Sequence, residues 1–489
     1  MYPDFDTFKT LAEKGNLIPV YKEILADADT PVTAYLKVGG SPSFLLESVE
    51  GGEKWARYSF IGSRPSRIIK GKGRTVTIID GSQAPQIITA DDPMALVQEE
   101  ISRYRPVEIK GLPRFFGGLV GYIGYDMVRY FETINLKEKQ GLDLPDFFLM
   151  VTDTMLIFDN LRQKIKVISN AHIVGQTPEE AYQEATEKIR SLIEQLRTPL
   201  AMNDHSGAPK EEVLDSNQTK AAFMASVDAA KEYIRAGDIF QVVLSQRFSR
   251  PSTADPFNIY RALRVINPSP YMYFIDIGEA KIVGSSPEIL VRLEGSKIVL
   301  RPIAGTRRRG ETDAEDRALE EELKQDPKEL AEHIMLVDLG RNDVGRVSRP
   351  GSVQVTDMMS VEKYSHVMHL VSNVEGELQE GLNAFDVLGA CFPAGTVSGA
   401  PKVRAMEIID ELEPTGRGPY AGSVGYFSYS GNMDTCITIR TLIIKDGAIY
   451  VQSGAGIVAD SQPENEYTET VNKARGMIKA VDMAEEGLG

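Results

Sequence analysis

Hydrophobic and polar positions along the chain follow two periods, one helical and one of strict alternation. Apolar residues recur every three or four positions over 177–196, where Thr177 and Glu180 have the spacing of an N-terminal capping box. The same spacing predicts a second helix through Phe223, ended by Gly237. Each helix has one apolar face, which is typical of a helix that packs on a core.

A strand with two unlike faces is predicted over 239–248. Phe240 belongs to its apolar face, whereas Gln241, Ser245 and Arg247 lie on the other, which is therefore a polar site or faces solvent. Several hairpins follow, with turns predicted near Gly278, at 294–296, near Gly431 and at 446–447. Strand pairs separated by single helices favour an α+β fold with largely antiparallel sheets.

The clearest interruption of this pattern is a polar stretch rich in Asn, Asp, Ser, Gly and Pro. We interpret it as a linker over 198–219, because it has no apolar period. It divides the chain into an N-terminal domain over 1–197 and a C-terminal domain over 220–489. A chain of 489 residues is long enough for about three domains of ordinary size, so a division is expected.

Composition narrows the class of protein. The chain has 54 Lys and Arg against 70 Asp and Glu, and its net charge of −16 argues against nucleic acid as a partner. The sequence shows no signal segment and no apolar run long enough to span a membrane, so we expect a cytoplasmic protein with no membrane partner. Cys391 and Cys436 are too few for a disulfide scaffold and are expected to be small buried side chains.

Glu332 lies within a strongly apolar helix that is predicted to begin at 326–327 and to end at Gly340. A carboxylate surrounded by apolar side chains needs a cation, a hydrogen-bond donor or a proton. One interpretation of Glu332 is therefore a structural ion pair with Arg341 or Arg346.

A second acidic helix follows 461–464 and carries Glu469, with Lys473 one turn beyond. These two residues have the i,i+4 spacing of an ordinary surface ion pair. Alternatively, Glu332 and Glu469 each give one carboxylate to a Mg²⁺ ion, which favours oxygen ligands and often takes few of them from the protein. The spacing alone does not decide between these interpretations.

Two glycine-rich segments, 393–402 and 453–456, have the composition of turns, and each could also present backbone N–H groups to an anion. Neither has the spacing of a phosphate loop or of a dinucleotide-binding turn, so nucleotide binding is not supported. Arg440, in an expected strand over 436–440, adds a guanidinium group suited to a carboxylate.

The C-terminal half resembles the chorismate-utilising enzymes from about Phe223 to about Val481, in order and without large gaps. The resemblance is carried by four segments, 302–307, 332–339, 393–402 and 454–456. In the N-terminal half, 45–48 and 57–62 resemble the companion domain of anthranilate synthase component I. The resemblance implies largely antiparallel β-sheets packed in a sandwich and flanked by helices.

The resemblance also implies a Mg²⁺-dependent lyase reaction. Chorismate and ammonia give anthranilate and pyruvate through an aminated cyclohexadiene, in tryptophan biosynthesis. Ammonia normally comes from glutamine through a separate glutaminase subunit, with two of each subunit in a heterotetramer. Neither Cys391 nor Cys436 lies in a Gly-x-Cys-x-Gly turn, so the chain needs that partner or free ammonia.

Site residues follow from the resemblance, position by position. Glu332 and Glu469 match the Mg²⁺ ligands, and Glu288 matches the general acid that protonates the departing ring hydroxyl. His369 matches the residue implicated in the elimination of pyruvate, and Thr396 would hydrogen-bond near the reacting ring. The substrate-holding positions, which offer donors to two carboxylates, are Gly305, Thr306, Tyr420, Arg440, Gly454, Ala455 and Gly456.

Two positions distinguish the chain from other branches of the family. Aminodeoxychorismate synthases, the second candidate, commonly carry a lysine nucleophile where this chain has Ala304. Isochorismate and salicylate synthases carry a lysine base where this chain has Gln241, which can position a nucleophile but cannot deprotonate it. Both differences agree with amination followed by elimination.

The resemblance further implies feedback inhibition by tryptophan. Ser48 with Pro270, Tyr271 and Met272 matches an inhibitor pocket at the contact between the two halves, although ordinary core packing is an alternative. A noncatalytic tryptophan-binding regulator is a third hypothesis for the chain. The retention of four ionisable residues argues against it: Glu288, Glu332, His369 and Glu469.

Overall fold

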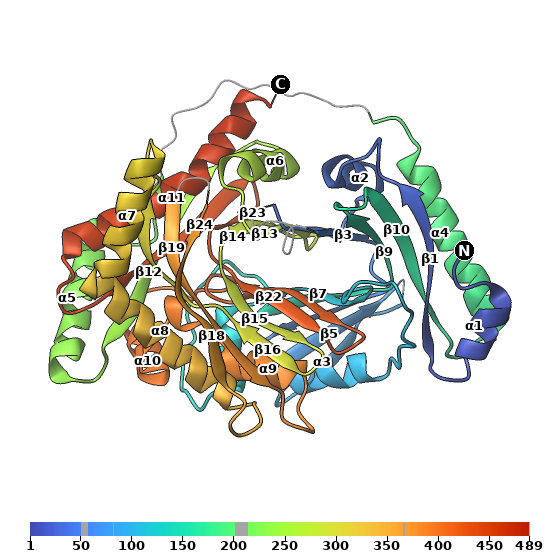
Figure 1. Cartoon of the computed structure of the whole chain (residues 1–489), viewed down its shortest axis with the longest axis horizontal. Helices are drawn as coiled ribbons and strands as arrows, with labels where there is room; N and C mark the ends of the chain where they lie inside the picture. Colours follow the sequence, from blue (N-terminus) through green and yellow to red (C-terminus); the bar gives the residue numbers. More distant parts are fainter. Residues whose placement is uncertain (50–56, 82, 201–213, 365–366, 489) are drawn as a thin grey trace.

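Two large antiparallel β-sheets form the centre of the molecule. The computed structural model describes residues 1–49, 57–81, 83–200, 214–364 and 367–488. Within these described ranges each sheet has 12 strands, and the pairs within both sheets are antiparallel (Figure 1). This confirms the α+β fold with antiparallel sheets that the sequence predicts.

The first sheet has strands of both halves of the chain. Its order is β1 (Leu17–Leu25), β10 (Lys164–His172), β9 (Thr154–Asp159), β3 (Tyr58–Ser63), β2 (Ser43–Glu47), β13 (Tyr271–Asp276), β14 (Lys281–Ser286), β23 (Thr441–Lys445), β24 (Ala448–Ile457), β12 (Gln241–Pro251) and β11 (Asp215–Ser216), with β20 (Gly399–Ala400) also paired to β12.

The second sheet is built in the same way. Its order is β17 (Ile303–Arg308), β19 (Val367–Glu377), β16 (Lys297–Leu300), β15 (Ile289–Glu294), β22 (Met433–Ile437), β21 (Ser423–Ser428), β7 (Gly118–Ile123), β8 (Phe147–Thr152), β4 (Arg67–Lys72), β5 (Thr75–Asp80) and β6 (Gln86–Thr89), with β18 (Gln354–Lys363) also paired to β19.

Helices pack on the outer sides of this sandwich (Figure 1). Beside the first sheet lie α1 (Phe5–Leu11), α2 (Pro31–Val38), α4 (Pro178–Leu196), α5 (Lys220–Ala236), α6 (Pro256–Ile266) and α11 (Pro463–Glu486). Beside the second sheet, or at its ends, lie α3 (Pro93–Ser102), η1 (Tyr125–Tyr130), α7 (Asp313–Gln325), α8 (Pro327–Gly345) and α9 (Ala384–Cys391). The short helix η2 (Gly395–Val397) and helix α10 (Lys402–Leu412) contact β12 and β20 of the first sheet.

Helix ends and hairpin turns confirm the local signals in the sequence. The capping box of Thr177 and Glu180 forms at the start of α4. Helix α5 ends at Gly237, whose φ of 84° lies in the left-handed region that glycine tolerates. The predicted turns connect β13 to β14, β15 to β16, β21 to β22 and β23 to β24.

Three local predictions are wrong. Helix α8 does not end at Gly340 but continues to Gly345. Gly340 instead allows close packing, since a Cβ there would lie 3.0 Å from Leu300. That helix is also less buried than its composition suggests, with Ile334 44% exposed. Phe240 precedes β12 and is 72% exposed, so it does not belong to an apolar strand face.

The proposed linker separates two segments that are mixed within both sheets. Strand β2 of the N-terminal half pairs with β13 of the C-terminal half, and β7 pairs with β21. Within 198–219, residues 201–213 lie outside the described residues, and Asp215–Ser216 pair with β12. The domain boundaries at 197 and 220 stay a prediction.

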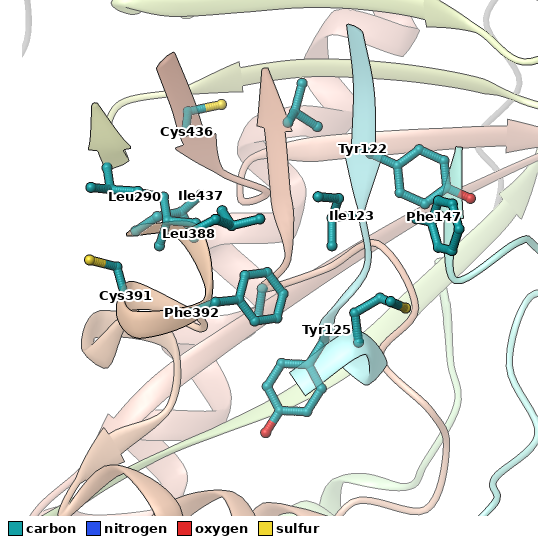
Figure 2. Packing of buried hydrophobic residues seen from close by; sticks show 14 of the residues in the cluster. Tyr122, Ile123, Tyr125, Phe147, Leu290, Leu388, Cys391, Phe392, Cys436 and Ile437 are labelled. Atoms are coloured by element: carbon teal, nitrogen blue, oxygen red, sulfur yellow. The ribbon is translucent and has the colours of Figure 1, made fainter. Parts of the chain in front are cut away.

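A single core joins the facing sides of the two sheets. Phe60 of the first sheet lies 6.0 Å from Tyr426 of the second, measured between ring centroids. The core also contains Cys391 and Cys436, both buried and without a disulfide, as expected (Figure 2). No helix among the described residues has the length and apolar character that a membrane span needs. The cytoplasmic location stays a prediction.

Two of the links by which the chain crosses from one sheet to the other lie next to each other. Residues 287–288 connect β14 to β15, and residues 438–440 connect β22 to β23. The backbone N–H of Ile437 donates to the carbonyl of Glu288 at 3.0 Å, and that of Ser285 donates to the carbonyl of Arg440 at 3.0 Å. Because the links are hydrogen-bonded to the flanking strands, Glu288 and Arg440 are held at the junction of the two sheets.

Candidate active site

Glu288 is the buried acid of this junction. The residue is 9% exposed, and burial raises the pKa of its carboxyl to about 8, although the neighbouring Thr396 hydroxyl opposes the shift. Glu288 and Thr396 line one small cavity of about 30 Å³ beside α8. At neutral pH the carboxyl is therefore protonated, which is the state that a general acid requires.

Arg440 lies in the other link. It is not part of a strand, as the sequence suggested, because β22 ends at Ile437 and the backbone bends with φ 50° at Arg440. Burial lowers the pKa of Arg440, while the nearby Glu469 and Tyr420 raise it. Arg440 and Glu469 line one open cavity of about 450 Å³, so a cation and a carboxylate face the same space.

The glycines at 454 and 456 lie within strand β24 and not in a turn, which corrects the sequence interpretation of 453–456. A Cβ at Gly454 would lie 2.7 Å from the Tyr420 hydroxyl oxygen, and a Cβ at Gly456 would lie 2.6 Å from Gln241 Nε2. Both glycines are therefore needed for close approach of a polar side chain to the strand. Ala455, between them, is fully buried in the core and has only backbone groups to offer.

The carboxylates of Glu332 on α8 and Glu469 on α11 converge. Burial raises the pKa of Glu332 most, the charge of the neighbouring Glu329 raises it further, and the charge of Glu469 acts in the same direction. Gln241 Nε2 donates to Glu332 Oε1 at 3.4 Å. The structural alternative for Glu332 is wrong, since the two arginines that it requires pair with Asp338 and Glu132.

Glu469 also makes the surface ion pair that its spacing suggested. Lys473 Nζ lies 2.6 Å from Glu469 Oε1 and donates to the carbonyl of Gly454 at 2.9 Å. Lys473 therefore links the acidic helix to the glycine-bearing strand. The i,i+4 spacing predicted the first contact, whereas the second depends on tertiary packing.

A divalent metal would find two carboxylates here. Among the residues that the structure describes, no group of three or more His, Cys, Asp or Glu side chains is arranged for a metal ion. Two carboxylates with substrate and water are nevertheless a usual ligand set for Mg²⁺. The charge of Glu469 adds to the raised pKa of Glu332, which fits a cation between the two carboxylates.

His369, on β19, is oriented by two neighbours on β17. Its Nδ1 lies 3.0 Å from Thr306 Oγ1 and 3.1 Å from the carbonyl oxygen of Gly305. A carbonyl only accepts, so Nδ1 carries the proton and Nε2 keeps the lone pair of a base. Burial lowers the pKa of His369, which favours this neutral form, and the charge of Arg440 acts in the same direction.

Glu329 is a site residue that we did not identify from the sequence. A Cβ on Gly305, where φ is 70° and the β17–β19 register shifts, would lie 3.1 Å from Glu329 Oε2. Glu329 is also 3.3 Å from Arg307. Its spacing of one helical turn from Glu332 was the only available signal.

A second, separate cavity of about 350 Å³ lies between the sheets, and we call it the β2–β13 cavity. Its charged side chains are paired: Tyr271 Oη donates to Asp434 at 2.9 Å, and Arg292 Nε donates to the same carboxylate at 2.9 Å. The lining includes all four residues of the inhibitor pocket expected from the sequence, Ser48, Pro270, Tyr271 and Met272.

Comparison with known proteins agrees with this arrangement. The family model described as chorismate binding enzyme matches residues 42–479. Anthranilate synthase component 1 of Acetivibrio thermocellus is 50% identical, with 99% of each chain covered. The crystal structure of anthranilate synthase component I from Streptococcus pneumoniae superposes with a TM-score of 0.79 at 41% identity, covering 93% of this chain and 98% of that one.

A more distant structure shows the same fold. The menaquinone-specific isochorismate synthase MenF of Escherichia coli superposes with a TM-score of 0.72 at 18% identity, with 98% of each chain covered. The family model and the full-length relative extend across both halves of the chain. The chain therefore belongs to the chorismate-binding enzymes and, among them, to the anthranilate synthase component 1 family.

Proposed function

We propose that the chain converts chorismate and ammonia to anthranilate and pyruvate. The observation that carries the proposal is a buried carboxyl group, Glu288, which is protonated at neutral pH and lies in one sheet-to-sheet link, while Arg440 lies in the adjacent link. Chorismate has two carboxylates and a ring hydroxyl, so its reaction needs cationic and neutral donors together with a proton source.

In the first step, Glu288 gives its proton to the departing ring hydroxyl while ammonia forms the new C–N bond, and water leaves. The ammonium group that forms then loses a proton, which can restore the Glu288 carboxyl. Gln241 positions the ammonia without acting as its base. Thr396, beside Glu288, contacts the ring.

In the second step, His369 removes the ring proton through Nε2, and the C–O bond to the enolpyruvyl group breaks. Pyruvate leaves and the ring becomes aromatic. Arg440, Tyr420 and the backbone of β24 hold the substrate carboxylates, because they offer donors around one space. Gly305 and Thr306 orient His369 and complete the pocket wall.

Glu332 and Glu469 would hold a Mg²⁺ ion. When bound, this ion neutralises a carboxylate of the substrate, which the acidic protein would otherwise repel. Gln241 orients Glu332 through its amide N–H at 3.4 Å. Lys473 does the same for Glu469 at 2.6 Å.

Ammonia comes from a partner glutaminase, with two copies of each chain in the assembly. Glutamine hydrolysis needs an accessible thiolate, but Cys391 and Cys436 are buried, and burial raises the pKa of both thiols well above the ordinary value. The name component 1 of the relatives supports a second component.

Tryptophan inhibits the enzyme from the β2–β13 cavity. The cavity offers aromatic and apolar side chains together with both signs of charge, including Glu47 and Arg114, and so suits a zwitterion with an indole ring. Its volume of about 350 Å³ is within the range of small-ligand sites. A regulatory ligand at this place links the product of the pathway to its first reaction.

The test of the proposed function uses the purified full chain with chorismate, Mg²⁺ and ammonium. Anthranilate fluorescence and an equal amount of pyruvate are expected. Formation of 4-amino-4-deoxychorismate without anthranilate would favour the second candidate, although Ala304 offers no lysine nucleophile for that branch. Tryptophan binding with no turnover would favour the noncatalytic regulator.

A further inference from the structure

We propose that Arg417, paired with Glu413, is a positioning residue that sets the geometry of three separate substrate-facing segments. The inference rests on the proposed function, since it concerns how that active site is assembled. Arg417 is only 3% exposed and lies in the segment after α10, outside the residues that we assign to chemistry.

The guanidinium group of Arg417 uses its fork of donors on three acceptors. Nη1 donates to the carbonyl of Val397 at 2.7 Å, and Nη2 donates to the carbonyl of Val243 at 2.7 Å. Nε and Nη2 also donate to the Glu413 carboxylate, at 2.9 and 2.6 Å. These bonds tie η2 and β12 to the end of α10 through one planar group.

Glu413 extends the same network along β12. Its Oε1 accepts from the backbone N–H of Ser245 at 2.7 Å and from the Ser245 hydroxyl at 2.8 Å. Gln452 Nε2, on the neighbouring β24, donates to that hydroxyl at 2.9 Å. The carboxylate therefore fixes β12 beside β24, at Ser245 opposite Gly454 in the register.

Each segment fixed by this pair carries a residue of the proposed mechanism. Val397 directly follows Thr396, which lies beside Glu288. Strand β12 begins with Gln241. Tyr420 lies under the guanidinium, with 5.5 Å from its ring centroid to the Arg417 carbon, and its backbone N–H donates to the Arg417 carbonyl at 3.3 Å.

The N-terminal half also contacts this network. Tyr125 is a core residue of η1 (Figure 2). Its ring centroid lies 4.7 Å from the Arg417 guanidinium carbon. The backbone N–H of Tyr125 donates to the carbonyl of Gly418 at 2.8 Å. The companion half therefore supports the same positioning group from its other side.

A fully desolvated ion pair is weak evidence for stability, because desolvation offsets much of the attraction between the charges. Its better-supported use is to specify one arrangement out of several. Arginine is required here because only its planar fork reaches two carbonyls and a carboxylate at once, whereas a lysine ammonium cannot match that geometry.

The test compares Arg417→Lys with Arg250→Lys. Arg250 is a matched control, because it is a buried arginine on β12 outside the Arg417–Glu413 network. It is 5% exposed and has two carboxylate partners, Asp482 at 2.8 Å and Glu485 at 3.0 Å. We expect both variants to lose thermal stability. Only Arg417→Lys should lose kcat/KM for chorismate, by about 100-fold, since a displacement of about 1 Å near reacting groups has that effect.

Two readouts separate positioning from loss of structure. In Arg417→Lys, kcat should fall and KM rise, because η2 and Tyr420 both shift. The alkaline limb of the kcat/KM profile should also move to higher pH, since Thr396 no longer lowers the pKa of Glu288. Asp343 also lines the Glu288 cavity, but its partner Lys402, at 2.7 Å, is unchanged in both variants.

Glu413→Gln provides a second variant of nearly equal size. It should reproduce the loss of kcat/KM more weakly, because the amide oxygen still accepts from Ser245 and from Arg417 Nη2, but the neutral amide offers no second acceptor to Arg417 Nε. An inactive wild-type protein would refute the proposed function. An active wild type, with Arg417→Lys within threefold of it or Arg250→Lys equally impaired, would refute the positioning role alone.

Discussion

The candidate active site and the β2–β13 cavity differ in how their charges are balanced. Within the described residues, Glu288 and Glu332 make no ion pair, and both have raised pKa values because of burial. In the β2–β13 cavity, the Asp434 carboxylate accepts hydrogen bonds from Arg292 and Tyr271, each within 3 Å. The Glu47 carboxylate accepts a hydrogen bond from the Tyr260 hydroxyl at 2.6 Å. The active site therefore contains buried carboxyl groups without ion partners, one of them protonated, whereas the charges of the β2–β13 cavity are paired without a ligand.

This difference indicates what each region is built to do. Buried carboxyl groups without ion partners destabilise the free protein. They nevertheless supply a proton donor and a cation site without further rearrangement. A balanced cavity adds little charge to a ligand and binds it through shape and apolar area. Substitutions in the first region should therefore change chemistry, and substitutions in the second should change only inhibition.

The largest effect is expected for Glu288→Gln, which keeps the shape of the side chain but removes the acidic proton. General acid catalysis contributes a factor of about 10²–10⁴, so kcat/KM should fall by that amount. In the wild type, kcat/KM should decline as pH rises through about 8, because Glu288 then loses its proton. The variant should lack this decline. A variant within tenfold of wild type would remove Glu288 from the mechanism.

The same substitution should stabilise the fold at alkaline pH. The unfolded carboxyl ionises near its ordinary value of 4.5, whereas the folded one ionises near 8, so only the unfolded state releases the proton between these values. Wild-type stability is therefore lost as pH rises across this window, and Gln has no such loss. A higher Tm for Glu288→Gln at pH 9, with equal Tm values at pH 4, is the expected calorimetric result.

The sequence alone predicts features that depend on neighbouring residues better than contacts between segments far apart in the chain. The capping box of Thr177 and the turn at 446–447 involve only residues that are close in the sequence, so the sequence alone predicts them. The prediction that Phe240 lies on an apolar strand face was wrong, because the alternation of apolar and polar residues does not reveal where a strand begins. Glu288 and Arg440 lie in two adjacent sheet crossings that are far apart in the chain, and no local pattern encodes that proximity. Only the family resemblance brought them together beforehand.

A smaller effect, about 100-fold on the second step, is expected for His369→Ala. Without the neutral imidazole, amination continues but the ring proton is removed slowly, so the aminated intermediate should accumulate and be visible by liquid chromatography and mass spectrometry. Thr306→Val, which removes only the hydroxyl 3.0 Å from Nδ1, should give a milder accumulation. Equal loss of both steps in His369→Ala would contradict a role in elimination alone.

For Glu332→Gln we expect a 10-fold to 100-fold increase, to order of magnitude, in the Mg²⁺ concentration needed for half-maximal activity, since one of two carboxylate ligands is lost. Calorimetric titration of the protein with Mg²⁺ and a substrate analogue measures the same change without turnover. Asp338→Asn, on the exposed side of the same helix and paired with Arg341, is the matched control and should bind Mg²⁺ normally. An unchanged Mg²⁺ requirement in Glu332→Gln would mean that the metal, if required, is held elsewhere.

The smallest effect on catalysis is expected for Ser48→Leu in the β2–β13 cavity. The larger apolar side chain occupies space that the tryptophan ring needs, so the inhibitory concentration should rise about tenfold, which corresponds to about 1.4 kcal/mol. Without tryptophan, kcat and KM for chorismate should stay within about twofold of wild type, because the active-site charges are untouched.

Ser63→Leu is the matched control for this last comparison. Ser63 lines a different cavity of about 390 Å³, between β3, β9 and α4, and its hydroxyl donates to the carbonyl of Val38 at 2.8 Å. Both variants exchange serine for leucine in the N-terminal half, but only Ser48 borders the proposed inhibitor site. If the two variants retain the same sensitivity to tryptophan, as measured by calorimetric binding and by inhibition of anthranilate formation, the inhibitor binds elsewhere. The balanced charges of the β2–β13 cavity would then be ordinary core structure, which was the alternative interpretation of its sequence.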